Sequence, residues 1–160
     1  MFQNCSGLTS IPEKLLPATT LTVGCYTYMF YWCSGLTTLP LNLLPATELV
    51  DSCYNSMFQN CSNLTNTPKL PALTLGTSSS NFIDRYRSMF QNCKKLKTVY
   101  CNARYAYGNN AISGSTYGKY GFNWLSGVAS SGTFYKNSAV TYNTRSANFI
   151  PTGWTTATYS

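Results

Sequence analysis

Apolar side chains recur at steps of four through the stretch LLPATELVDSCYNSMFQNC. The stripe consists of Leu49, Cys53, Met57 and Cys61, and one copy earlier of Leu21, Cys25, Met29 and Cys33. Tyr54 and Phe58 widen the stripe, and Pro45 suits the first turn of a helix, where a backbone N–H has no intrahelical partner. The pattern therefore predicts an amphipathic helix in this half of each copy.

The other half of each copy predicts a short strand. In CSGLTSIP and CSGLTTLP, apolar residues stand beside threonine and ahead of a proline that would stop ladder pairing. A single strand and helix cannot bury both of their apolar faces. Stacked copies can, because they form a continuous core with a parallel sheet along one side.

The copies begin at Met1, Met29, Met57 and Met89, at periods of 28, 28 and 32 residues. These periods lie in or just above the range of leucine-rich repeats. We predict an α/β leucine-rich repeat solenoid over residues 1–101, with short parallel strands on one side and helices on the other. For residues 102–160, rich in Gly, Ser, Asn, Thr and Tyr, we expect an irregular, partly β C-terminal cap with short strands around GTFYK and GWTTATY.

The repeat units CYTYMFYWCSGLTTLP and CYNSMFQNCSNLTNTP, with the links PATTL and PATEL, resemble BspA-type leucine-rich repeats. The tail stretches GFNWLSGVASSGTFYKN and IPTGWT are similar to the closing segment of such proteins. The family comprises surface proteins and phage or prophage tail-fibre proteins of gut Bacteroidales. The resemblance implies an extracellular location, either on a virion or on a bacterial cell surface.

Only 9% of the residues are charged, and the formal net charge is +7. Six of the basic residues fall within residues 85–104 and are candidates for anion binding: Arg85, Arg87, Lys94, Lys95, Lys97 and Arg104. Such a cluster can track an anionic polymer, or it can be a solvated edge that keeps the protein soluble. For an outward-facing protein we expect an acidic glycan rather than nucleic acid.

The sequence does not predict an enzyme. It contains no histidine, its four carboxylic residues are far apart, and no glycine-rich phosphate loop occurs. Six of the seven cysteines occupy two repeat positions, and none of the seven belongs to a CxxC motif, so we expect buried thiols and neither disulfides nor a metal site. No cofactor is expected. Arg85 replaces a cysteine of the stripe, so it should turn outward or pair with Asp84 or another acid.

We therefore expect a recognition or adhesion module that binds a cell-surface glycan or protein receptor. Residues predicted to point outward from the strands, or to stack on sugar rings from the cap, are candidate contacts: Thr9, Thr37, Thr38, Thr65, Asn66, Lys97, Tyr105, Tyr107 and Trp124. The alternative is a structural component of a virion that binds no host ligand.

No apolar run is long enough to span a membrane, so no membrane insertion is expected. The first copy begins in the middle of a repeat, ahead of the first predicted strand. Because solenoids need capping units, we expect another copy, a different subunit or further repeats to cover this end.

Overall fold

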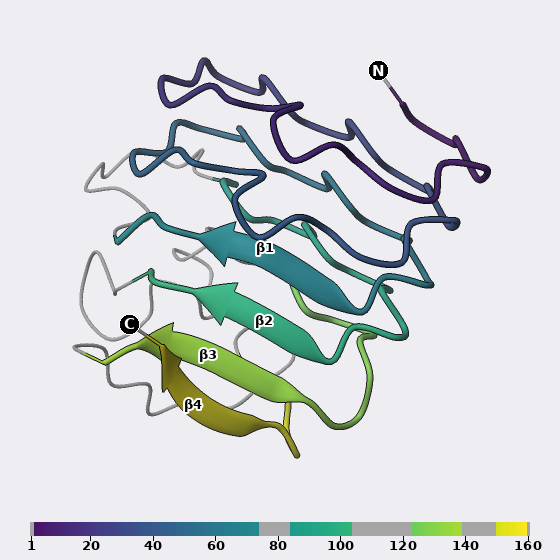
Figure 1. Ribbon diagram of the computed structural model, residues 1–160, viewed down its shortest axis with the longest axis vertical. Helices are drawn as coiled ribbons and strands as arrows, with labels where there is room; N and C mark the ends of the chain where they lie inside the picture. Colours follow the sequence, from purple (N-terminus) through teal and green to yellow (C-terminus); the bar gives the residue numbers. More distant parts are fainter. Residues whose placement is uncertain (1, 74–83, 104–122, 139–149, 160) are drawn as a thin grey trace.

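The computed structural model describes residues 2–73, 84–103, 123–138 and 150–159. The chain winds in successive coils that stack along one axis, with the N-terminus at one end of the stack (Figure 1). Each coil, here called a rung, has an extended side and a turn-rich side. Residues 27 to 35 positions apart are therefore neighbours in adjacent rungs throughout the repeats.

Within the described residues, four parallel strands form one sheet along one side of the stack. They are β1 (Asn66–Leu70), β2 (Thr98–Cys101), β3 (Thr133–Asn137) and β4 (Thr155–Tyr159), and they pair in that order. The predicted parallel sheet is confirmed, as are the strands in GTFYK and GWTTATY. The sheet continues from β2 to β3, so the predicted repeat and cap regions share a single sheet.

Side chains take over part of the pairing around β1 because Pro68 lies inside that strand. The pairing register between β1 and β2 shifts between Asn66 and Lys69. The Asn66 amide bonds to the backbone N–H and carbonyl of Leu39, at 3.2 and 2.8 Å. The Thr67 hydroxyl accepts the Tyr100 amide hydrogen at 3.0 Å. In the first two copies, the stretches CSGLTSIP and CSGLTTLP contain no strand, so the prediction of a strand is wrong for these two copies.

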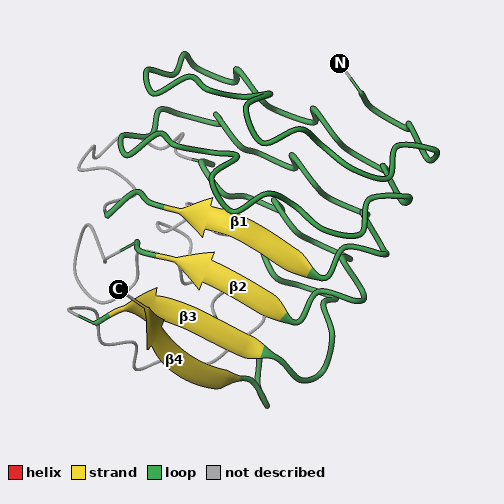
Figure 2. Ribbon diagram, in the orientation of Figure 1, coloured by secondary structure: helices red, strands yellow, loops and turns green. Residues whose placement is uncertain are grey.

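The helix predicted over Pro45–Cys61 is wrong, and the described residues contain no helix (Figure 2). Consecutive tight turns occupy this side of each rung instead. The amides of Met29 and Cys33 donate to carbonyls three residues earlier, those of Tyr26 and Phe30. The third residue of each of these turns, Tyr28 or Trp32, has a positive φ. This geometry is that of type II β-turns, repeated every four residues. We call the segment the turn ribbon.

The stripe at steps of four is real, but its cause is the turn ribbon. In an α-helix, residues four apart are offset by about 40°, so a stripe made only of such steps winds around the helix. A chain of four-residue turns returns each fourth side chain to the same side. Glycine, asparagine and serine occur at the positive-φ positions, as at Gly24, Ser52 and Asn60. Glycine and asparagine tolerate that conformation best, and none of the three is a strong helix former.

Every second amide of the ribbon points along the stack and donates to the next rung. Examples are Tyr26 to Cys53, at 3.0 Å, and Phe30 to Met57, at 2.9 Å. The remaining amides close the turns, so the ribbon pairs its backbone N–H groups without a helix or a sheet. This pairing holds the rungs in register on the side opposite the strands.

Two columns of aromatic rings run through the core beneath the ribbon. Their centroids are 5.3 to 6.1 Å apart, and the columns are Phe2–Phe30–Phe58–Phe90 and Tyr26–Tyr54–Tyr86. Both columns end on Trp124, which stacks on Tyr86 and meets Phe90 edge on. Trp124 also continues the ribbon, because its carbonyl accepts the Phe90 amide hydrogen at 2.9 Å.

This position corrects the prediction that Trp124 could contact a ligand. Its exposed fraction is 0%, because both aromatic columns and Phe134 pack around it. The indole therefore closes the repeat core and has no surface to offer to a sugar.

All seven cysteines are free thiols, and five of them are buried, as predicted for core thiols. Three of them form a ladder, because each thiol donates to a phenylalanine carbonyl of the previous rung. The pairs are Cys33 to Phe2, Cys61 to Phe30 and Cys93 to Phe58, at 2.8, 3.1 and 3.2 Å. Cys5 is exposed and Cys25 is half-buried, so burial is not confirmed for these two.

Candidate binding surface on the parallel sheet

The outward side of the sheet brings together several residues predicted as contacts. Thr37, Thr65 and Lys97 form a column along the stack, because Thr65 N–H donates to Thr37 O and Lys97 N–H to Thr65 O. All three side chains are exposed, as are those of Thr9 and Thr38. The Thr65 hydroxyl donates to the Thr37 carbonyl at 2.9 Å, so part of its bonding capacity is used within the fold.

Three tyrosines gather beside this column. Tyr100 on β2 and Tyr135 on β3 are register partners, and their rings stack with centroids 4.7 Å apart. Tyr159, at the end of β4, meets Tyr100 edge on at 5.6 Å. The ammonium of Lys69 on β1 lies 5.6 Å from the Tyr159 centroid, within the range of a cation–π contact. We call these four residues the tyrosine cluster.

The tyrosine cluster contains one buried hydroxyl group, that of Tyr159. The Tyr159 hydroxyl is buried and has no hydrogen-bond partner within the described part of the chain. Burial raises the pKa of this phenol to about 12, with smaller contributions from Cys101 and Tyr100. The hydroxyl therefore stays neutral at physiological pH and retains its capacity to donate or accept a hydrogen bond.

A row of hydroxyl groups crosses the same face. Thr98, Thr133 and Thr155 are register partners on β2, β3 and β4. The hydroxyls of Thr133 and Thr155 lie 3.2 Å apart. Hydroxyl groups can both donate and accept hydrogen bonds, so this row complements ligands that are rich in hydroxyl or carboxylate groups.

The charge of this face is positive. Lys69 is half-buried and Lys97 is exposed, whereas none of the chain's four carboxylic residues belongs to a strand. Lys94 and Lys95, also predicted to bind anions, are exposed just ahead of β2. An anionic ligand is therefore favoured on approach to the sheet.

Other predicted residues are not available on this face. Arg85 is 6% exposed and pairs with Asp51 at 3.3 Å, so it does not belong to an open anion site. Arg87 pairs with Asp84 at 3.1 Å on the ribbon side. The Asn66 amide is occupied by the Leu39 backbone. Three further candidates lie outside the described residues: Arg104, Tyr105 and Tyr107.

Sequence reasoning did not select Lys69, Tyr135 or Tyr159. Tyr135 and Tyr159 stand in the predicted strands GTFYK and GWTTATY, so their strand context was readable. The order of the strands and the parallel register were needed to place them next to Tyr100. Neither follows from the sequence of the cap.

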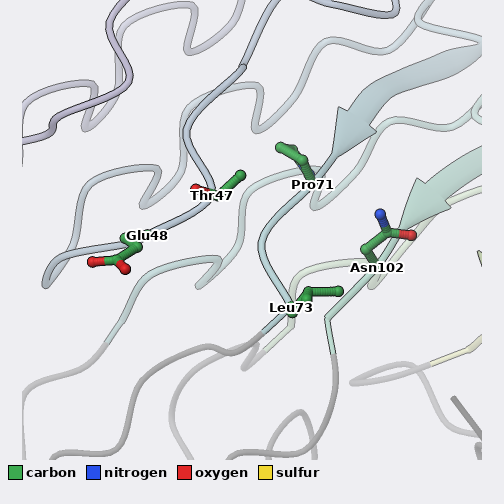
Figure 3. Close-up of a pocket in the computed structure, with 5 residues that line it drawn as sticks. All are labelled: Thr47, Glu48, Pro71, Leu73 and Asn102. Carbon is green, nitrogen blue, oxygen red and sulfur yellow. The ribbon is translucent and has the colours of Figure 1, made fainter. Parts of the chain in front are cut away.

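A separate pocket of about 550 Å³ lies beyond the carboxyl ends of β1 and β2 (Figure 3). Its lining residues are Thr47, Glu48, Pro71, Leu73 and Asn102. The carboxamide oxygen of Asn102 is buried and has no partner among the described residues. The Glu48 carboxylate points away from Pro71 and Asn102 in Figure 3. The lining of the pocket thus combines the apolar residues Pro71 and Leu73 with the polar residues Thr47, Glu48 and Asn102.

The described ranges contain no cluster of three or more histidine, cysteine or carboxylic residues that could hold a metal ion. Within the same ranges, no helix is long and apolar enough to cross a membrane. Comparison with known proteins yields no relative: no family model, curated protein or solved structure matches the chain.

Proposed function

We propose that this chain is a non-enzymatic recognition module that binds acidic glycans on the outward side of its parallel sheet. The observation that carries the proposal is the tyrosine cluster, in which Tyr100 and Tyr135 stack beside Lys69 on a partly exposed face. Aromatic faces bind the apolar C–H side of sugar rings, and tyrosine adds a polar group at its edge.

The neighbouring groups supply the rest of a glycan site. The Thr98, Thr133 and Thr155 row offers hydroxyls to sugar hydroxyls. Lys97 and Lys69 favour a carboxylate or sulfate on the glycan, and the strands contain no acid to oppose it. Stacked rungs extend this face along one axis, which suits a linear polymer better than a small molecule.

We further propose that the stack is a leucine-rich repeat solenoid whose turn ribbons replace the usual helices. The resemblance of its repeats to BspA-type proteins supports a place on a phage or prophage fibre or on a bacterial surface. Such a position would put the sheet within reach of cell-surface glycans.

A glycan array at physiological salt, followed by calorimetry on the bound glycans, tests the proposal. Tyr135→Ala should weaken binding about tenfold, whereas Tyr135→Phe keeps the ring and should bind nearly as well. Lys97→Gln should weaken binding and reduce its salt dependence. Lys14→Gln is the matched control, because Lys14 is an exposed lysine outside the strands. Absence of any bound glycan would favour the structural virion role instead.

A further inference from the structure

The second rung departs from the repeat on the outside of the turn ribbon. Where the other three copies read Gln-Asn after Met-Phe, this copy reads Tyr31-Trp32, and Tyr28 replaces the serine of the third and fourth copies. Tyr28 and Trp32 are 43% and 51% exposed. The Tyr31 ring meets both of them edge on, with centroids 5.4 and 6.4 Å away. We call Tyr28, Tyr31 and Trp32 the aromatic triad.

The backbone under the triad disfavours large side chains. Tyr28 and Trp32 have φ values of 56° and 59°, in the left-handed region. Asparagine, which tolerates this region, occupies the position of Trp32 in the other copies, for example Asn60 with φ 65°. Bulky residues at positive φ are outliers, and such strain is concentrated at binding sites.

The triad also interrupts a hydrogen-bond ladder. In the third and fourth copies, Gln59 donates to Gln91 and Asn92 donates to Asn60, each at 2.9 Å. Rings at the corresponding positions of the second copy cannot extend these side-chain amide pairs. The exchange costs hydrogen bonds and favourable backbone conformations, yet it leaves the Tyr28 and Trp32 side chains about half exposed to solvent. Folding alone gives no reason for it.

The surroundings of the triad are polar but neutral. The backbone N–H of Asn4 donates to the backbone carbonyl of Tyr31, and the backbone N–H of Trp32 donates to the backbone carbonyl of Gln59. Residues with side-chain carboxamides therefore border the triad on both neighbouring rungs. The residues aligned with the triad there are uncharged: Gln3, Asn4, Ser56, Gln59 and Asn60. Carboxamides both donate and accept hydrogen bonds, which matches vicinal sugar hydroxyls.

We propose that the aromatic triad is a second carbohydrate site, which binds neutral pyranose sugars. The indole of Trp32 stacks on the C–H face of the ring, and the bordering carboxamides bond to its hydroxyls. The site goes beyond the proposed function, because it lies on the turn ribbon and lacks the lysines of the sheet face. A neutral ligand rather than an acidic one follows from that difference.

Tryptophan indole signals in nuclear magnetic resonance spectra test the site directly. The chain has three tryptophans, and Trp124 and Trp154 are 0% and 2% exposed. The probes are neutral gluco-oligosaccharides: cellohexaose, laminarihexaose and maltohexaose. At least one of them should shift the Trp32 indole N–H signal, and only that indole signal, in a saturable way. If none shifts it at millimolar concentration, the proposal fails.

The matched variant Tyr28→Ser/Tyr31→Gln/Trp32→Asn gives the second copy the residues of the third. It should bind the active oligosaccharide at least about tenfold more weakly and should melt at the same or a higher temperature. A lower melting temperature would instead assign the triad to the stability of the fold. Tyr135→Ala should leave the Trp32 response unchanged, so failure of this site and failure of the sheet site are separate results.

Discussion

The guanidinium Nη2 of Arg85 lies 3.3 Å from Oδ1 of Asp51, and this pair links two successive rungs of the stack. Arg85 occupies the ribbon position of Cys53 and Cys25, and its carbonyl accepts the Tyr54 amide hydrogen. The expectation that Arg85 would either turn outward or pair with an acid is thus met by pairing. The side chain stays 7% exposed, whereas Asp51 keeps 33% of its side-chain surface in solvent.

Arg85→Cys should lower the free energy of unfolding by about 1 to 3 kcal/mol, because it leaves the Asp51 carboxylate without its partner. The loss should be smaller than for a fully buried pair, since Asp51 is partly solvated. Asp51→Val/Arg85→Cys, which reproduces the Val23 and Cys53 of the preceding rungs, should recover most of it. Urea unfolding of the three proteins measures both effects, and an additive loss in the double variant would contradict the pairing.

Thiol reactivity should separate the cysteines by their position in the stack. With a disulfide reagent at mildly alkaline pH, Cys5 should react quickly and Cys25 more slowly, while the five buried thiols react only after unfolding. Seven thiols should be counted in denaturant. Cys5→Ser is the control, because it should remove the fast phase alone. Rapid reaction of five or more native thiols would disprove the burial of the ladder.

Alkaline pH should destabilise the protein through the same residues. Burial raises the pKa of Cys53 and of Cys61 from the ordinary value of 9.0 to about 12. Because the folded state holds these protons more tightly, their contribution to stability is complete below pH 9 and is lost as the pH rises toward 12. Burial also raises the pKa of Tyr54, which acts in the same direction.

Urea unfolding between about pH 7 and about pH 10.5 measures this loss. Cys53→Ser/Cys61→Ser removes two of the titrating thiols and should show a shallower decline above pH 9. A stability that stays level up to pH 10.5 in the wild type would be inconsistent with buried, neutral thiols.

Ser52 distinguishes the turn ribbon from a helix. Its φ is 57°, and the equivalent residue one copy earlier is Gly24, with φ 67°. Ser52→Gly should therefore match or exceed the wild type in stability, and Ser52→Ala should be less stable than Ser52→Gly by about 1 kcal/mol. In a helix the order would be reversed, since glycine is the weaker helix former. Thermal unfolding of the two variants decides between these geometries.

Close contact between the cap and the last repeat should be sensitive to one methyl group. A Cβ atom added at Gly132 would lie 2.5 Å from the Lys97 carbonyl oxygen and 2.8 Å from the Trp154 ring. Gly132→Ala should cost about 1 to 3 kcal/mol, because backbone and indole must both move. Gly7→Ala is the control, since nothing lies within 4 Å of its added Cβ. Equal stability of the two variants would contradict this prediction, because it would mean that the cap can shift to make room for the added methyl group.

The repeat, its register and its buried positions follow from the sequence alone. Copies aligned at Met1, Met29, Met57 and Met89 place equivalent residues in adjacent rungs, because a chain with a constant period stacks like on like. The parallel sheet and the buried cysteines of the stripe were predictable for this reason. The strands GTFYK and GWTTATY were readable from their β-branched and aromatic residues.

The conformation of the other half needed the tertiary structure. A stripe at steps of four fits both a helix and a ribbon of turns, and the choice depends on hydrogen bonds between rungs, such as Phe30 to Met57, that no single copy contains. The positions of Trp124 and of the tyrosine cluster also depend on contacts between rungs. Trp124 is buried because two aromatic columns end on it, and Tyr159 reaches Tyr100 because β4 joins the sheet next to β3. Local sequence specifies neither contact, since each joins segments that meet only when the rungs stack.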